Sequence, residues 1–129
     1  MKTTVAELVD KANQAVKTYS VAEARELLNR DNVVFIDVRD EPEIARDGKI
    51  PRGVNISRGM LEFRIDSESP YHNPIFSQQK EFVFYCASGG RSALAAQRAK
   101  EMGLNAVAHV GGGFKAWLEA AQPTEKSDD

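Results

Sequence analysis

The stretch FVFYCASGGRSALAAQRAKEMG, residues 82–103, decides the fold and contains the only cysteine of the chain, Cys86. Its first five residues are apolar or aromatic, which predicts a short buried strand. Its second half is rich in alanine and other helix-forming residues, and Gly103 is placed to end that helix as a C-terminal cap. Cys86 is therefore expected where a buried strand turns directly into a helix.

Strands and helices alternate on both sides of this stretch. Residues 33–38 and 105–110 are apolar enough for buried strands, and residues 54–56 predict a brief one. Further helices are expected at residues 20–30 and 114–121. Short strands that alternate with helices predict an α/β domain with a mainly parallel central sheet and helices on both faces.

The chain of 129 residues suits one domain. An amphipathic pattern predicts a lead-in helix at residues 1–18, followed by the domain at 19–122 and a polar, frayed tail at 123–129. The apolar face of the lead-in helix would pack on the domain or on a second copy of the chain. The sequence therefore leaves a homodimer open.

Composition excludes several kinds of partner. No apolar run is long enough to cross a membrane, and charged side chains interrupt any signal sequence near the N-terminus, so a cytoplasmic location is expected. The net charge of −2 comes with dispersed lysines and arginines, which provide no basic stripe for nucleic acid. One cysteine forms no internal disulfide, and His72 and His109 are not spaced to share a metal with it. His109, inside a predicted strand, is expected to be a structural histidine.

The loop that follows the cysteine has the properties of an anion cradle. Gly89 and Gly90 allow the backbone to turn tightly with its amides pointing inward. Those amides, the helix N-terminus and Arg91 would favour the thiolate of Cys86 over the thiol. The same donors can hold the negative charge of a terminal sulfur once a persulfide has formed.

Four blocks of the sequence occur in the order and at the spacing of the rhodanese family: IDVRDEPEI, DGKIPRGVNI, FVFYCASGGRSALAA and GGFKAW. The chain resembles that family from about residue 19 to about residue 121. The resemblance implies a three-layer domain in which the cysteine that opens a six-residue loop accepts a sulfane sulfur and passes it on. Cys86 matches this cysteine. The rest of the loop and the residue after it are Ala87, Ser88, Gly89, Gly90, Arg91 and Ser92.

Other residues have a supporting role in this interpretation. Asp37 and Arg39 follow a predicted strand and are expected to form a structural ion pair, which by resemblance would hold the active loop and its neighbouring segment. Arg52, like Lys49, adds positive charge that would attract an anionic donor. Ser92 could donate to the sulfur, but capping the following helix is the favoured role.

The function expected from these residues is sulfur transfer through a Cys86 persulfide, without a metal or an organic cofactor. The donor would be thiosulfate, a polysulfide or a persulfide, and the acceptor a thiol, cyanide or a protein. Ala87 and Ser88 are uncharged where the best-known thiosulfate-using members carry basic residues, which argues against thiosulfate as the natural donor. A noncatalytic protein-binding module with a redox-sensing cysteine remains an alternative.

A phosphatase or an arsenate reductase is a less favoured alternative. Only four residues separate Cys86 from Arg91, whereas phosphatases built on this or a similar cradle have five residues between cysteine and arginine. The smaller ring suits a single sulfur better than a tetrahedral phosphoryl group.

Overall fold

A parallel sheet of five strands, in the order β1-β5-β4-β2-β3, forms the centre of the molecule. A computed structural model describes residues 2–127. Each neighbouring pair of strands in this sheet is parallel. The strands are β1 (Lys17–Tyr19), β2 (Val33–Asp37), β3 (Val54–Asn55), β4 (Glu81–Tyr85) and β5 (Val107–Val110).

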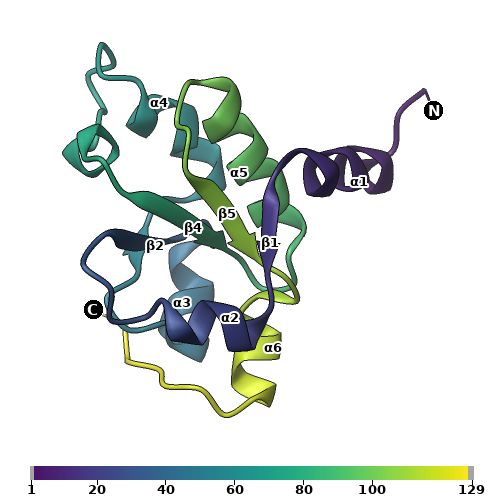
Figure 1. The fold of residues 1–129 in the computed structure, drawn as a ribbon, viewed down its shortest axis with the longest axis vertical. Helices are drawn as coiled ribbons and strands as arrows, with labels where there is room; N and C mark the ends of the chain where they lie inside the picture. The colour runs from purple at the N-terminus through teal and green to yellow at the C-terminus, as the bar shows by residue number, and fades with distance from the viewer. Residues whose placement is uncertain (1, 128–129) are drawn as a thin grey trace.

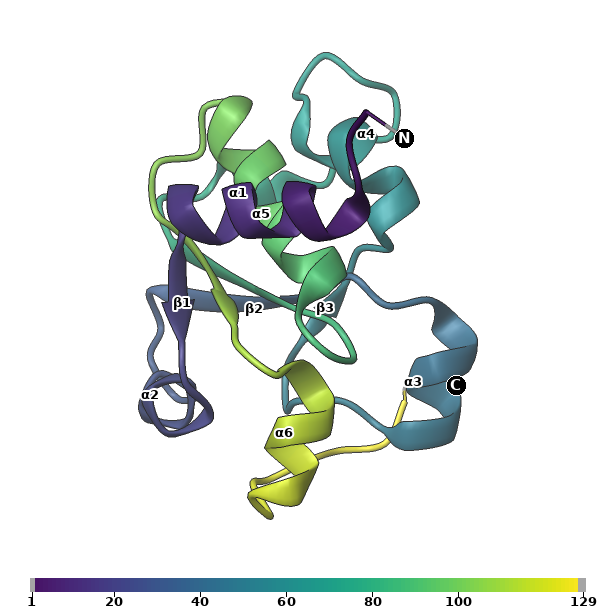
Figure 2. The ribbon, with the colours of Figure 1, turned by 90° about the vertical axis from the view of Figure 1, so that its right-hand side faces the viewer.

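Helices cover both faces of the sheet, as Figures 1 and 2 show. One face carries α1 (Val5–Ala15), α4 (Leu61–Ile65) and α5 (Gly90–Glu101), and the other carries α2 (Val21–Glu26), α3 (Glu41–Asp47) and α6 (Gly113–Glu119). Short 3-10 turns at η1 (Arg58–Met60) and η2 (Pro74–Ser77) complete the chain. The predicted α/β class, with a parallel sheet between two helical layers, is confirmed.

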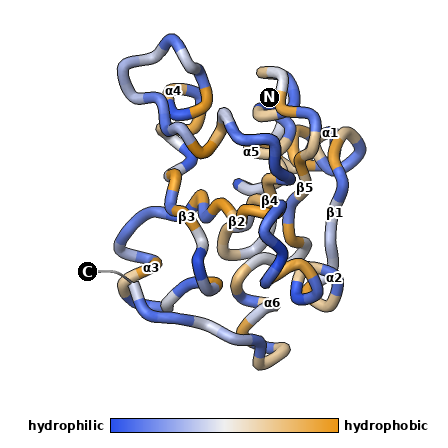
Figure 3. Tube along the Cα trace, turned by 60° about the vertical axis from the view of Figure 1, so that its left-hand side comes forward, coloured by the Kyte–Doolittle hydropathy of each residue, from blue (hydrophilic) through white to orange (hydrophobic). Residues whose placement is uncertain are grey.

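The side chains of β2 and β4 pack alternately into two hydrophobic clusters, one on each face of the sheet. Val34, Ile36, Phe82 and Phe84 pack with the alanines of α5, whereas the alternate residues of the same strands pack toward Trp117. Alternation arises because successive side chains of a strand point to opposite faces. Both faces are buried, so the strands are almost continuously apolar, and Figure 3 shows hydrophobic colour along β2 and β4.

The N-terminal segment differs from its expected form. The helix expected over residues 1–18 ends at Ala15, and the chain then forms β1, which pairs with β5 at the edge of the sheet. Thr4 caps α1, because its side chain accepts a hydrogen bond from the Glu7 amide. The helix expected at residues 20–30 is also shorter, since α2 ends at Glu26. None of the helices described at residues 2–127 is long and apolar enough to cross a membrane.

The tail is anchored where fraying was expected. Lys49 and Glu125 form an antiparallel bridge through reciprocal backbone hydrogen bonds of 2.9 Å. The indole N–H of Trp117 donates to the Pro123 carbonyl at 2.7 Å. The polar composition of the tail gave no sign of these contacts, because they use its backbone and not its side chains. Residues 128 and 129, also expected to fray, lie outside the described residues.

Candidate active site

The loop of residues 86–92, called the Cys86 loop below, joins the end of β4 to α5. The Cys86 sulfur is buried, and two backbone N–H groups point at it: that of Gly89 at 3.1 Å and that of Ser92 at 3.4 Å. Gly89 has a φ of 109°, a conformation that favours glycine and lets the chain turn straight into the helix. Backbone amides in this arrangement stabilise negative charge on the sulfur.

Helix α6 holds the Cys86 loop through two backbone hydrogen bonds. The amide of Phe114 donates to the Cys86 carbonyl at 2.7 Å, and that of Lys115 donates to the Ala87 carbonyl at 3.0 Å. Gly113 makes this approach possible, because a Cβ atom there would lie 2.5 Å from the Cys86 carbonyl oxygen. The glycines at 111–113 therefore form a turn that brings α6 against the Cys86 loop.

The side chain of Arg91 is paired with an acidic residue on α3. Its guanidinium donates two hydrogen bonds to Glu43, at 2.8 and 2.9 Å. Arg91 lowers the pKa of Glu43 to about 2. Glu43 also accepts a hydrogen bond from the Asp40 amide at the start of the helix. The Cys86 loop is thus fixed to α3, and part of the Arg91 charge is neutralised there.

The pairing of Arg91 with Glu43 predicts that the free energy of unfolding depends on pH in the acid range. The folded-state pKa of Glu43 lies below its ordinary value of 4.5, so its contribution is fully present above pH 4.5 and is lost as the pH falls toward about 2. The difference in urea midpoint between the wild type and Glu43→Gln should therefore shrink across this range. Glu119→Gln, at an exposed position on α6, is the control and should show no comparable trend. A constant difference for Glu43→Gln would contradict the prediction.

Asp37 and Arg39 form a buried ion pair beside the loop. The Arg39 guanidinium donates to the Asp37 carboxylate at 3.0 and 2.7 Å, and both side chains are only 1% exposed. Arg39 also donates to the Gly48 carbonyl at 2.8 Å. Its guanidinium carbon lies 4.3 Å from the ring centroid of Phe114, the residue whose amide holds Cys86. The pair thus connects β2 with the segment at Gly48 and with α6, which holds the Cys86 loop.

Lys49 and Arg52 make their contacts away from the sulfur. Arg52 donates to the Leu28 carbonyl and to the Asn29 side chain, near the end of α2. Lys49 donates to the Gly53 carbonyl at 3.1 Å and forms an ion pair with Glu125. The structure thus places Asp37 and Arg39 against α6, which holds the Cys86 loop, whereas Arg52 joins the segment before β3 to the turn that follows α2.

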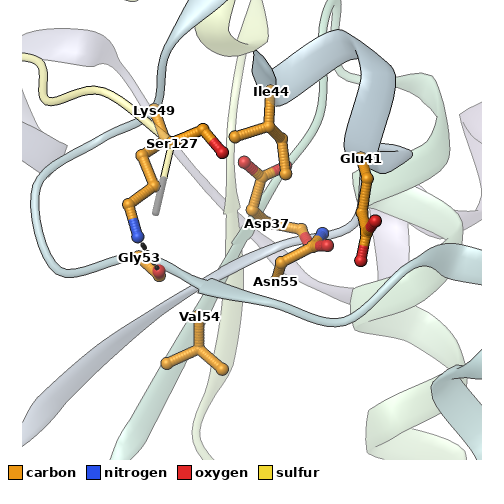
Figure 4. Close-up of a pocket in the computed structure, with 8 residues that line it drawn as sticks. All are labelled: Asp37, Glu41, Ile44, Lys49, Gly53, Val54, Asn55 and Ser127. Atoms are coloured by element: carbon orange, nitrogen blue, oxygen red, sulfur yellow. Dashed lines mark hydrogen bonds between the residues drawn. The ribbon is translucent and has the colours of Figure 1, made fainter. Parts of the chain in front are cut away.

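A pocket of about 350 Å³ lies beside α3 and the tail (Figure 4). In Figure 4 Lys49 reaches the Gly53 carbonyl, and Asp37 lies between Ile44 and Asn55. The described residues that line it are Asp37, Glu41, Ile44, Lys49, Gly53, Val54, Asn55 and Ser127, which do not include the Cys86 loop. This pocket therefore does not open onto the Cys86 loop, whose exposed residue is Ser88.

Ser92 and His109 lie closer to Cys86 than the sequence suggested. Ser92 is the third residue of α5, whose N-cap is Gly89, so the expected role of Ser92 as the helix cap is wrong. Its hydroxyl lies 3.5 Å from the Cys86 sulfur and 3.0 Å from Nδ1 of His109. A histidine within an apolar strand gives no sign of such a neighbour, because the contact depends on how β5 packs against α5.

No group of three or more histidine, cysteine, aspartate or glutamate side chains within residues 2–127 is arranged to bind a metal. The fold and the loop define an α/β domain with a cysteine at the carboxyl end of a central parallel strand. The model of the rhodanese-like domain family matches residues 20–120. The chain therefore belongs to the rhodanese-like domain family.

Relatives in this family include sulfurtransferases. The putative sulfurtransferase YtwF of Bacillus subtilis is 32% identical over 109 residues, covering 84% of this chain and 96% of YtwF. The human single-domain sulfurtransferase TSTD1 is 32% identical with a TM-score of 0.68, covering 81% of this chain and 96% of that structure. These similarities support a sulfurtransferase kind of activity.

A structure from Rhodopseudomonas palustris is similar over nearly the whole chain. It is 50% identical with a TM-score of 0.95 and covers 97% of this chain and 96% of its own. That protein is named as one of unknown function and a possible tyrosine phosphatase. Its similarity extends over the N-terminal segment, which lies before the residues that the family model matches.

Proposed function

We propose that the chain transfers sulfane sulfur through a persulfide on Cys86. The observation that carries this proposal is the pair of backbone N–H groups, from Gly89 and Ser92, directed at one buried sulfur atom. Amides fixed in this way stabilise an anion without reorganising as the reaction proceeds. They would favour the thiolate first and would then lie close to the terminal sulfur that carries the charge of the persulfide.

The reaction has two displacement steps. The Cys86 thiolate attacks the outer sulfur of the donor, a new S–S bond forms, and the donor leaves with the electron pair of the bond that breaks. A thiolate or cyanide then attacks the outer sulfur of the persulfide and restores the Cys86 thiolate. Atoms and charge balance without a metal, a redox cofactor or an external oxidant.

Persulfides are the donors that the loop favours. Ala87 and Ser88 carry no charge, and Arg91 is already paired with Glu43, so the loop has less positive charge to offer a dianion such as thiosulfate. A persulfide carries a single negative charge and needs less compensation, whereas an inorganic polysulfide is a dianion like thiosulfate. The acceptor is a small thiol, cyanide or a cysteine of another protein.

Persulfide formation is tested directly by mass. Incubation of the reduced protein with thiosulfate or polysulfide should add the mass of one sulfur atom to the peptide that contains Cys86, and dithiothreitol should remove it. Prior alkylation of Cys86 is the control and should prevent the addition. Failure to form the adduct with every donor, in protein whose Cys86 alkylates normally, would reject the proposal and favour a noncatalytic module.

Phosphatase activity is the second candidate, because the similar protein from Rhodopseudomonas palustris is named as a possible tyrosine phosphatase. The ring from Cys86 to Arg91 has four intervening residues, and Arg91 is held by Glu43. Both features leave little room and little free charge for a phosphoryl group. Hydrolysis of p-nitrophenyl phosphate should therefore be negligible, and robust turnover that disappears on alkylation of Cys86 would support the phosphatase instead.

A further inference from the structure

A continuous line of side chains joins the N-terminal helix to the Cys86 sulfur. Oδ1 of Asn13, on α1, lies 2.7 Å from Nε2 of His109. Nδ1 of His109 lies 3.0 Å from the Ser92 hydroxyl, and that hydroxyl lies 3.5 Å from the sulfur. Thr18, on β1, adds a second contact of 3.2 Å to Nε2. Each link is within hydrogen-bonding distance for the atoms involved.

The donor and acceptor properties of these groups set the direction of each hydrogen bond along the line. Oδ1 of Asn13 only accepts hydrogen bonds, so Nε2 of His109 carries the proton and Nδ1 of the neutral ring is an acceptor. Burial lowers the pKa of His109, which favours the neutral ring. The Ser92 hydroxyl then donates to Nδ1, at a shorter distance than its alternative acceptor, the Gly89 carbonyl at 3.3 Å. The Ser92 oxygen is left to accept from the Cys86 thiol.

We propose that His109, fixed in one tautomer by Asn13, is a positioning residue that receives the Cys86 proton through Ser92. The S–H proton passes to the Ser92 oxygen while the Ser92 proton passes to Nδ1 of His109. The products are a thiolate between the loop amides and an imidazolium whose Nε2–H still donates to Asn13. This inference rests on the proposed function, because sulfur transfer is the reaction that uses the thiolate.

The polar surroundings of His109 suit this role. Its hydrogen-bond partners are uncharged and come from three elements: Asn13 from α1, Thr18 from β1 and Ser92 from α5. A histidine that served only to hold α1 in place would need only the first two. The contact with Ser92 extends the line to the titratable group at its end, Cys86.

The charged groups near the sulfur belong to the Cys86 loop and to the start of α3. The Arg91 guanidinium is near enough to the Cys86 sulfur for their charges to interact, and Glu43 and Asp40 face the same guanidinium. These charges act on the sulfur whether or not His109 is present. The variants that test this proton relay, from Cys86 through Ser92 to His109, therefore leave all of these charges in place.

The relay also gives the N-terminal segment a role in the site. Asn13 and Thr18 both precede residues 20–120, which the family model matches. Helix α1 lies across α5 in Figure 2, and Lys100 of α5 donates to the Ala15 carbonyl at 2.8 Å. The segment thus contributes a side chain that sets the protonation of a group inside the domain.

The test is the rate at which iodoacetamide alkylates Cys86 as a function of pH. His109→Gln places an amide that can still contact Asn13 but cannot take up a proton, and Ser92→Ala interrupts the relay while His109 and α1 stay in place. Both variants should move the alkylation midpoint up by about one pH unit, which is about a tenfold slower reaction below the midpoint. Asn13→Asp should move it down, because a carboxylate stabilises the imidazolium.

Two measurements keep the outcomes distinct. Thermal unfolding identifies variants that fail to fold, and Ser67→Ala, at an exposed position on the loop after α4, is the control for Ser92→Ala and should keep the wild-type midpoint. Unchanged midpoints in folded His109→Gln and Ser92→Ala would overturn the relay. Alkylation needs no sulfur donor, so shifted midpoints without any persulfide would reject the proposed function and not the relay.

Discussion

A Cys86→Ser variant should fold normally and transfer no sulfur. Serine preserves the size of the side chain, and its oxygen can accept hydrogen bonds from the amides of Gly89 and Ser92 that now point at sulfur. A hydroxyl is a weak nucleophile at neutral pH and cannot form a persulfide. Loss of a catalytic nucleophile lowers turnover on the order of 10⁴-fold or more. Thiocyanate formation from cyanide and a sulfane donor measures the effect.

The single cysteine makes this result decisive. No other thiol is present in the chain to replace Cys86, so the variant has no second nucleophile of the same kind. Ser67→Ala, on the exposed loop after α4, is the control and should retain full activity. Thiocyanate production by Cys86→Ser at the wild-type rate would show that sulfur transfer does not pass through a persulfide on this chain.

The fold was predictable because its main signals are local. Strands β2, β4 and β5 are largely buried on both faces, so a nearly continuous apolar run predicts each of them. The turn at Gly89 was predictable for a similar reason, since adjacent glycines after a buried strand indicate a conformation that other residues rarely adopt.

The remaining features depend on partners that are distant in sequence. Strand β1 has only three residues, and its pairing with β5 joins Thr18 to His109, 91 positions away. The line from Asn13 to His109 spans 96 positions, and the pair of Arg91 with Glu43 spans 48. A sequence pattern over a short window carries no information on such contacts, because tertiary packing brings them together. His109 consequently resembled an ordinary core residue.

The second large effect is expected at Arg39, whose removal should destabilise the whole domain. Arg39→Leu would leave the Asp37 carboxylate in a site where it is 1% exposed, with the guanidinium bonds of 3.0 and 2.7 Å gone. The backbone N–H of residue 39 would still donate to it, and the Tyr85 hydroxyl would still be hydrogen-bonded to it. Loss of one partner from a buried pair costs about 3–5 kcal/mol, so the urea unfolding midpoint should fall sharply.

The double variant separates the buried charge from the lost packing. Asp37→Asn combined with Arg39→Leu removes both charges and should recover part of the stability, because no uncompensated carboxylate remains. The lost contact of the guanidinium with Phe114, at 4.3 Å, and its bond to the Gly48 carbonyl would not be recovered. Equal midpoints for the single and double variants would assign the whole effect to these contacts. A higher midpoint for the double variant would show that the uncompensated carboxylate of Asp37 causes part of the destabilisation. The charge of Arg39 would then stabilise the region around Phe114, whose amide holds the Cys86 loop.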